Sequence, residues 1–242
     1  MNLRFVYRGL KARYRDDRCE LAALIGALRP DNIAVDVGAN KGSYLWSLSR
    51  AVPNGRVIAF EPQPRLADYL SRACIATGLR NVVVENAGVS EQNGNMTLAI
   101  PGEGDSPCAS FELAVRSRES CRTIEVQVYS LDEYFASEKA RIGALKIDVE
   151  GHELSVLQGA TMVLAKHAPL IVCECESRHM SEGNIGTVLD FFRDHSYDGF
   201  FVQRSRLVPI SEFKSDIHQM QVGERFWDSP DYCNNFILKR VG

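Results

Sequence analysis

A run of apolar residues at 33–37 leads directly into a glycine-rich turn, and a helical pattern follows the turn. Gly38 and Gly42 let the backbone turn tightly, and they let a ligand approach where a Cβ would otherwise block it. The free N–H groups at the start of the following helix attract electron-rich ligand atoms. The segment therefore predicts a nucleotide-binding strand–turn–helix unit, in which Asp36 lies at the strand tip and faces the ligand. A turn with a purely structural role is the alternative.

Strand-like and helical segments alternate along most of the chain, which is typical of an α/β protein with a parallel sheet. The segments that predict strands of this sheet are 33–37, 56–60, 81–86, 143–148, 170–175, 199–203 and 235–239. The segments that predict helices are 43–52, 64–77, 151–166 and 184–195, with a short helical turn at 131–135. Residues 94–101 and 123–129 also read as strands, with no helix between them. They predict a β insertion after the third strand of the sheet.

The chain has 242 residues, which is the length of one large α/β domain. We divide it into an N-terminal helical extension, residues 1–30, and a single domain that spans residues 31–242. Within the extension, residues 19–28 predict a helix that leads into the first strand. The extension is locally basic, and its basic residues are interleaved with apolar ones: Arg4, Arg8, Lys11, Arg13, Arg15 and Arg18 with Phe5, Tyr7, Leu10 and Tyr14. This pattern suits either a solvated helix or contact with a membrane or a phosphate group.

The overall charge is close to neutral, with a formal net charge of −3 and 24% charged residues. Such a charge gives no general attraction to nucleic acid, so we expect no nucleic-acid partner. No segment is long and apolar enough to span a bilayer, and the N-terminus lacks the apolar stretch of a signal peptide. The seven cysteines have no regular spacing, which is typical of a reducing compartment. We therefore expect a cytoplasmic protein without stable membrane insertion, and a homodimer is possible.

The turn departs from the dinucleotide fingerprint G-x-G-x-x-G, because Asn40 stands where the second glycine belongs. That glycine allows the backbone to approach a pyrophosphate, so a cofactor without pyrophosphate fits better. S-adenosylmethionine is such a cofactor, and Asp36 together with the turn would hold its amino acid portion. The turn residues that we assign to cofactor binding are Gly38, Ala39, Asn40, Gly42 and Ser43. A nicotinamide-dependent oxidoreductase is the alternative.

Two further strand tips carry polar residues. Glu61 ends the second strand, about twenty residues beyond the turn, where a carboxylate accepts hydrogen bonds from both ribose hydroxyls. An exposed carboxylate without a ligand is the alternative for this position. Asn86 follows the third strand, beside Ala87, and its amide is suited to the edge of an adenine. Because ligands bind outside the carboxyl ends of parallel strands, we expect these residues and Asp36 to form one pocket.

The fourth strand tip holds the densest group of ionisable residues, 146–153. Asp148 and Glu150 share a strand face, so either is a candidate general base, although acids also favour the start of a helix without any catalytic role. His152 has a suitable pKa range for proton transfer, but a histidine in a first helical turn is more often a packing residue. Carboxylates bind hard cations, yet no spaced His or Cys ligands accompany these, so we predict no metal site. Likewise, Cys173 and Cys175 are interpreted as small buried apolar residues rather than a metal pair.

Three segments together resemble the FkbM-type family of S-adenosylmethionine-dependent methyltransferases: VDVGANKG at 35–42, AFEPQP at 59–64 and LKIDVEGHELSVLQGA at 145–160. The resemblance covers roughly residues 30 to 240. It implies a Rossmann-like class I methyltransferase fold with a seven-stranded, mostly parallel sheet, helices on both faces and an antiparallel last strand. It also implies methyl transfer to a hydroxyl oxygen of a sugar, glycolipid or natural-product acceptor, so the expected partner is a small-molecule or glycan acceptor.

Carried over by position, the resemblance makes Asn86 and Ala87 neighbours of the adenine, and Asp148 and Glu150 the acids on the acceptor side. The implied reaction is an in-line displacement, in which an acceptor oxygen attacks the sulfonium methyl group. Asp148 is the first candidate for the base that deprotonates this oxygen, with Glu150 or His152 in reserve. A cofactor-binding module without catalytic activity, built on the same scaffold, is the alternative.

Overall fold

The computed structural model describes residues 2–112, 121–180 and 185–242. Its large sheet contains β1 (Ile33–Val37), β2 (Arg56–Phe60), β3 (Val82–Glu85), β7 (Ile142–Ile147), β8 (Leu170–Glu174), β9 (Tyr197–Gln203), β10 (Arg206–Pro209) and β11 (Asn235–Arg240). A small sheet contains β4 (Gly88–Val89), β5 (Gly94–Pro101) and β6 (Cys121–Tyr129). The α-helices are α1 (Leu3–Lys11), α2 (Arg18–Ala27), α3 (Leu45–Ala51), α4 (Pro64–Thr77), α6 (Leu131–Tyr134), α7 (Glu153–Gln158), α8 (Thr161–His167), α9 (Ile185–Asp194) and α10 (Ser215–His218).

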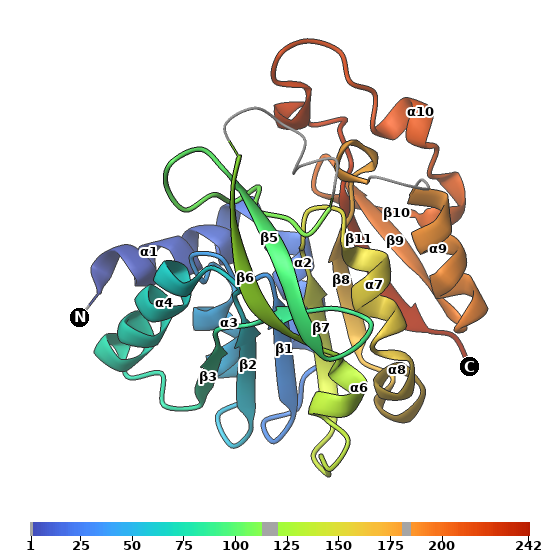
Figure 1. Ribbon diagram of the computed structural model, residues 1–242. Helices are drawn as coiled ribbons and strands as arrows, with labels where there is room; N and C mark the ends of the chain where they lie inside the picture. The colour runs from blue at the N-terminus through green and yellow to red at the C-terminus, as the bar shows by residue number, and fades with distance from the viewer. Residues whose placement is uncertain (1, 113–120, 181–184) are drawn as a thin grey trace.

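The large sheet has the strand order β10-β9-β11-β8-β7-β1-β2-β3 (Figure 1). β1 pairs parallel with both β2 and β7, whereas β11 lies antiparallel between β8 and β9. This arrangement confirms the predicted class I fold, including its antiparallel last strand. The carboxyl ends of β1, β2, β7 and β8 therefore meet at one edge of the sheet.

An eighth strand, β10, extends the predicted seven by pairing antiparallel with β9. The turn between β9 and β10 consists of Arg204 and Ser205, whose φ angles are 48° and 59°. Two-residue hairpin turns with positive φ are normally recognised in a sequence by the dipeptide Asn-Gly or Asp-Gly. Because Arg-Ser does not, the sequence did not indicate this hairpin.

The predicted helix at 151–166 is wrong, because the structure divides it into α7 and α8. The break lies at Gly159, where an added Cβ would come within 2.1 Å of the carbonyl oxygen of Ser90. Asp132 then starts the second helix, since its carboxylate accepts hydrogen bonds from the backbone N–H groups of Met162 and Val163. Tertiary contacts with the segments around β4 and α6 thus interrupt a helical pattern that is continuous in sequence.

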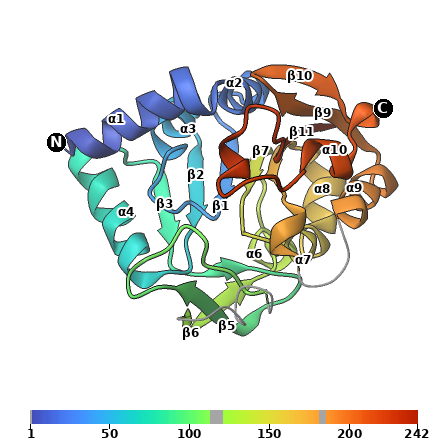
Figure 2. The ribbon, with the colours of Figure 1, turned by 90° about the horizontal axis from the view of Figure 1, so that it is seen from above.

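The β insertion is confirmed as the small sheet, in which β5 pairs antiparallel with β6 and β4 pairs parallel with it. The small sheet lies on one side of the large sheet, and α1, α2 and α3 lie on the other (Figure 2). Buried apolar residues form a separate cluster on each of these two sides. Cys173 and Cys175 are buried in the cluster that faces α7 and α9, which agrees with their interpretation as small apolar residues.

The N-terminal helices pack against the rest of the chain. Phe5 of α1 is fully buried in the second cluster, and α2 contacts β7, β8 and α3. A π-helical segment (Ala12–Asp16) connects α1 to α2, and the helix predicted at residues 19–28 is α2. Among the residues that the structure describes, no helix combines the length and apolarity needed to cross a bilayer.

Replacement of Gly9 by Ala should destabilise the fold by about 1–3 kcal/mol, because this helix surface is already packed to contact. The added Cβ would lie 2.6 Å from the Cβ of Trp46 in α3. Gly26→Ala in α2 is the matched control, since nothing lies within 4 Å of its added Cβ, and alanine there should stabilise the helix by roughly 0.5–1 kcal/mol. Urea unfolding of the two variants measures both values. Equal free energies of unfolding would contradict the tight contact between α1 and α3.

Candidate functional site

Two adjoining cavities lie at the carboxyl ends of the central strands. The first lies between the β1 and β2 tips and the small sheet, and its apolar lining includes Val37, Val89, Leu98, Phe111 and Val149. The second lies between the turn after β1, the tips of β7 and β8 and the N-terminal helices, and it is lined by Asp17, Tyr44, Lys146, Glu174 and Asn235, among others. Gly38, Asn40 and Asp148 line both cavities. An elongated ligand that spans the two cavities would therefore contact these three residues.

The turn after β1 requires its glycines for protein packing. Gly38 has a φ of 77°, and an added Cβ would lie 1.8 Å from the carbonyl oxygen of Asp148. Gly42 has a φ of 76°, and its added Cβ would lie 2.7 Å from the rings or methyl groups of Phe5 and Leu70. Asn40, at φ 48°, also adopts the left-handed conformation, which Asn tolerates better than most residues. The turn is thus wedged between β7 and the N-terminal helix α1.

Of the other predicted turn residues, Ala39 and Ser43 line the second cavity. Residues 41–44 continue the turn, and the helix begins only at Leu45. The predicted start of this helix at residue 43 therefore lies two residues too early.

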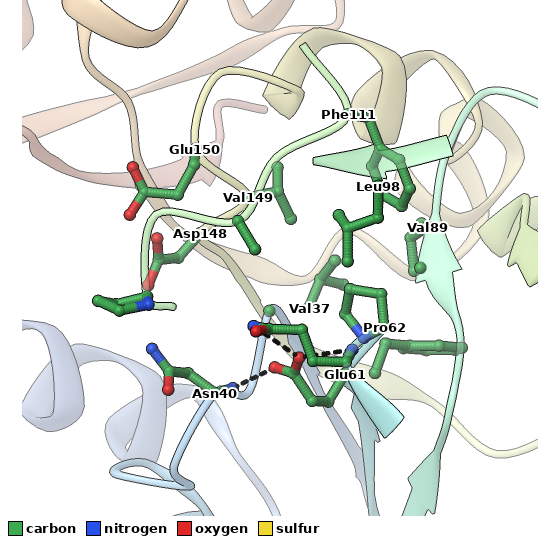
Figure 3. A pocket seen from close by; sticks show the side chains of 16 residues that line it. Val37, Asn40, Glu61, Pro62, Val89, Leu98, Phe111, Asp148, Val149 and Glu150 are labelled. Carbon is green, nitrogen blue, oxygen red and sulfur yellow. Dashed lines mark hydrogen bonds between the residues drawn. The ribbon is translucent and has the colours of Figure 1, made fainter. Parts of the chain in front are cut away.

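Glu61 is held rigidly in the wall of the first cavity. Its Oε2 accepts a hydrogen bond of 2.7 Å from the backbone N–H of Asn40, and its Oε1 accepts one of 2.9 Å from that of Gln63 (Figure 3). The side chain is only 2% exposed. Burial raises the pKa of Glu61 to about 7, although the two N–H donors favour the ionised form. The two hydrogen bonds thus fix the carboxylate in place, and its pKa lies close to neutral pH.

Asn86 and Ala87 do not line either cavity among the described residues. The amide of Asn86 donates hydrogen bonds to the carbonyl oxygens of Glu61, at 3.0 Å, and Pro62, at 3.3 Å. Ala87 is buried in the core. The structure therefore places Asn86 where it holds the turn that carries Glu61, and the apolar wall of the cavity comes from Leu98 and Phe111 instead.

Lys146 connects the tips of β1 and β7. Its Nζ donates a hydrogen bond of 2.8 Å to the carbonyl oxygen of Gly38 and lies 3.2 Å from carboxylate oxygens of both Asp36 and Asp148. Burial alone would lower the pKa of Lys146, but the carboxylates of Asp148 and Asp36 raise it above its usual value. The ammonium group therefore stays charged and orients Asp148.

Asp36 lies beneath the turn and is 1% exposed. It lines neither cavity in the described part of the chain, and Lys146 is its ionic partner. Burial raises the pKa of Asp36, and the Lys146 charge opposes that rise. Contrary to the sequence prediction, Asp36 therefore does not face a ligand directly but contacts Lys146, which lines the second cavity.

Asp148 and Glu150 both reach the first cavity, on the side opposite Val89, Leu98 and Phe111 (Figure 3). An Oε2 of Glu150 lies 2.5 Å from Nδ1 of His179, a residue only 3% exposed that follows β8. Burial raises the pKa of Glu150, and the hydrogen bond to His179 opposes this effect. Glu150 is therefore engaged by a histidine that the sequence did not indicate.

His152 is 5% exposed and lines neither cavity among the described residues. Its Nε2 lies 2.9 Å from the hydroxyl of Ser90, and its Nδ1 lies 3.0 Å from a carboxylate oxygen of Glu112. The structure thus brings two of the three predicted catalytic residues to the cavities and keeps the third in the interior.

Sequence reasoning also missed much of the second cavity. Glu174 accepts a hydrogen bond of 2.7 Å from the amide of Asn234, and burial raises its pKa well above the usual value. Asp17, from the N-terminal helices, is the other missed acid, and burial raises its pKa to about 7. The position of Glu174 at the tip of β8 follows the same rule that identified Glu61 and Asp148, so the rule could have found it.

Comparison with known proteins decides the family. A family model described as the methyltransferase FkbM domain matches residues 36–198, which is more than half of the chain. The chain belongs to the FkbM methyltransferase family. The expected resemblance is thereby confirmed.

Several curated proteins are related to this FkbM-family chain. Methyltransferase sdnD of Sordaria araneosa is 31% identical over 162 residues, which is 56% of this chain and 62% of the relative. Hexuronic acid methyltransferase AglP of Haloferax volcanii is 33% identical over 157 residues, 63% of this chain and 61% of the relative. The 31-O-demethyl-FK506 methyltransferase FkbM of Streptomyces tacrolimicus is 28% identical over 222 residues, 80% of this chain and 81% of the relative. The chain thus spans less than two thirds of the length of the first two.

Solved structures share the fold of this FkbM-family chain. Methyltransferase FkbM from Methylobacillus flagellatus has a TM-score of 0.54 and 17% identity, over 88% of this chain and 45% of that one. A methyltransferase from Streptococcus mutans, in complex with SAH, has a TM-score of 0.53 and 11% identity, over 94% of this chain and 98% of that one. At these identities the likeness shows the class I methyltransferase fold and nothing about substrates.

Proposed function

We propose that this chain transfers the methyl group of S-adenosylmethionine to a hydroxyl oxygen of a sugar, glycolipid or natural-product acceptor. The observation that carries the proposal is the buried carboxylate of Glu61, fixed by the N–H of Asn40 in the wall of the first cavity. A carboxylate at the end of the second strand suits the two hydroxyls of a ribose. The apolar wall formed by Leu98 and Phe111 suits the faces of an adenine.

Asn40 supports the choice of cofactor independently. Its Oδ1 is buried and has no hydrogen-bond partner within the described ranges, and the residue lies where the two cavities meet. Buried acceptors are normally satisfied, so a ligand N–H group would complete this site. When bound, S-adenosylmethionine supplies a methyl group on a positively charged sulfur. The carboxyl groups of Asp17, Asp148 and Glu174 give the second cavity hydrogen-bond acceptors that suit the amino group of the cofactor's amino acid portion.

We assign the general base to Asp148, with the acceptor approaching through the second cavity. Asp148 is oriented by Lys146, which remains protonated and so does not compete for the proton of the acceptor hydroxyl. Glu150 is the second candidate for the general base, and its carboxylate contacts Nδ1 of His179. His152 is assigned to holding Ser90 and Glu112 in place, because both of its ring nitrogens are engaged there.

Transfer to oxygen is supported by one relative whose own name includes an oxygen acceptor, the 31-O-demethyl-FK506 methyltransferase. That protein is also the relative reported above whose match spans four fifths of both chains.

The test combines ligand binding with a transfer assay. S-adenosylhomocysteine should raise the melting temperature of the protein and NADH should not. Incubation with labelled S-adenosylmethionine and a panel of sugars, glycolipids and polyketides should then label at least one acceptor. Stabilisation by NADH alone would favour an oxidoreductase, and binding of S-adenosylhomocysteine without labelling across the whole panel would favour a non-catalytic module.

A further inference from the structure

The outer surface of the N-terminal helices carries four exposed apolar or aromatic side chains in a row. Leu3, Tyr7, Leu10 and Tyr14 are 66%, 65%, 41% and 72% exposed. We call them the arm stripe. Their spacing of four and three residues places Leu3, Tyr7 and Leu10 on one face of α1, opposite the buried face that includes Phe5. Tyr14 follows in the π-helical segment. Figure 2 shows α1 along the outer edge of the molecule.

The arm stripe does not contribute to the core of the fold. α1 already buries Phe5 and Gly9 against the rest of the chain, so its other face would be expected to be polar. Rows of exposed apolar side chains on one surface mark interaction sites in soluble proteins. The stripe thus indicates a partner outside this chain.

Four basic side chains beside the stripe indicate the charge of that partner. Arg4, Arg8, Lys41 and Arg65 line a single hollow between α1, the turn after β1 and the start of α4. No ion pair joins any of the four to an acid in the described part of the chain. The one acid in the hollow, Asp105, lies 3.8 Å from Arg122 instead.

The stripe and the basic hollow are adjacent. Arg4, Arg8 and Tyr7 also line a second hollow, together with Lys11, Asp16 and Asp17. Lys11 and Arg15 do not add to the free charge, because both pair with Asp16. The surface therefore combines apolar side chains with a compact set of unpaired positive charges.

We propose that this surface docks on an anionic lipid bilayer, with the arm stripe in the interface and the four basic side chains towards lipid phosphates. Interfacial helices use this combination of an apolar face and flanking Lys or Arg residues. A second copy of the chain is a poorer partner, because pairing two stripes would bring their basic flanks together. The stripe and the basic hollow both lie on the surface of the fold, so the association that we propose is peripheral.

Co-sedimentation with vesicles tests the proposal on the chain of 242 residues. The protein should sediment with vesicles that contain phosphatidylglycerol and remain in solution with pure phosphatidylcholine. Each basic side chain near an anionic surface contributes about fivefold to binding, so Arg4→Gln combined with Arg65→Gln should weaken binding more than tenfold. Leu3→Ser combined with Tyr7→Ser should weaken it to a similar extent. Met162→Ser is the matched control, since Met162 is 68% exposed but belongs to α8.

All the replaced side chains are exposed, so the variants should melt at the wild-type temperature, and the two pairs test the stripe and the charges separately. Three results would overturn the proposal: no sedimentation with anionic vesicles, equal binding to neutral vesicles, or equal loss of binding in Met162→Ser. A wild-type dimer in light scattering that Leu3→Ser with Tyr7→Ser converts to a monomer would assign the stripe to a second copy instead. None of these measurements depends on methyl transfer.

Discussion

Replacement of Asp148 by Asn should reduce kcat by about 10²–10⁴-fold, which is the usual contribution of a general base. Asp148 lines both cavities, and Lys146 holds its carboxylate at 3.2 Å. An amide of the same shape keeps these contacts in part but cannot accept the proton of the acceptor hydroxyl. Steady-state kinetics with the acceptor found in the labelling panel measure the change, and calorimetry with S-adenosylhomocysteine should show affinity within about threefold of wild type.

Glu150→Gln is the matched control for Asp148. The Glu150 carboxylate is already paired with His179 at 2.5 Å, so its removal should affect kcat by less than about tenfold. A large loss of kcat in Glu150→Gln, together with near-normal turnover of Asp148→Asn at saturating acceptor, would contradict this assignment. Glu150 would then be the general base instead of Asp148.

Replacement of Glu61 by Gln should weaken binding of S-adenosylhomocysteine by about 100-fold or more, since each hydrogen bond to a charged group contributes about 1.5–3 kcal/mol. The carboxylate offers charged acceptors on a rigid support, and the amide offers one neutral acceptor. Isothermal titration calorimetry measures the loss. Glu85→Gln is the control, because Glu85 ends the neighbouring strand but bonds to the hydroxyl of Tyr134 at 2.7 Å and lines neither cavity in the described residues.

The same Glu61→Gln variant should be more stable to unfolding than the wild-type protein at alkaline pH, although it binds the ligand less tightly. Burial raises the pKa of Glu61 from 4.5 to about 7, so the folded protein favours the protonated form. The stability associated with this group is present below pH 4.5 and is lost as the pH rises towards 7. Over that window the variant should gain up to about 3 kcal/mol relative to wild type, since one pKa unit corresponds to about 1.4 kcal/mol.

Urea unfolding of both proteins near pH 5 and near pH 8 measures this difference. A variant that binds the ligand poorly and yet unfolds at higher urea than wild type cannot owe its weak binding to misfolding. A free-energy difference that is independent of pH would contradict the raised pKa of Glu61.

Hydrophobic periodicity was sufficient to predict most of the fold. The bounds of α4 were predicted without error, because Pro64 suits the first helical turn and Gly78, at φ 75°, ends the helix. The errors arose where a distant contact overrides a local pattern. Gly159 interrupts a continuous helical pattern because the backbone of Ser90 approaches it, and no local rule reveals that approach.

The candidate site was predictable to the extent that it follows the strand tips. Glu61 and Asp148 were found because the carboxyl ends of parallel strands meet at one edge. The same rule does not say which side of a strand faces the cavity, and so it did not place Asp36 beneath the turn. His179 was not found because it meets Glu150 from a segment about thirty residues downstream, a pairing that only the packed structure creates.

The packing of α1 against the turn after β1 has a thermodynamic consequence. Arg8 donates a hydrogen bond of 3.1 Å to the carbonyl oxygen of Lys41, and the ring of Phe5 fills the space beside Gly42. Any ligand that favours one position of α1 will therefore also favour one shape of the turn. If binding to a lipid surface changes the affinity of the protein for the cofactor by some factor, the cofactor must change the affinity of the protein for the lipid surface by the same factor. Vesicle binding measured with and without S-adenosylhomocysteine would report the free energy of that coupling.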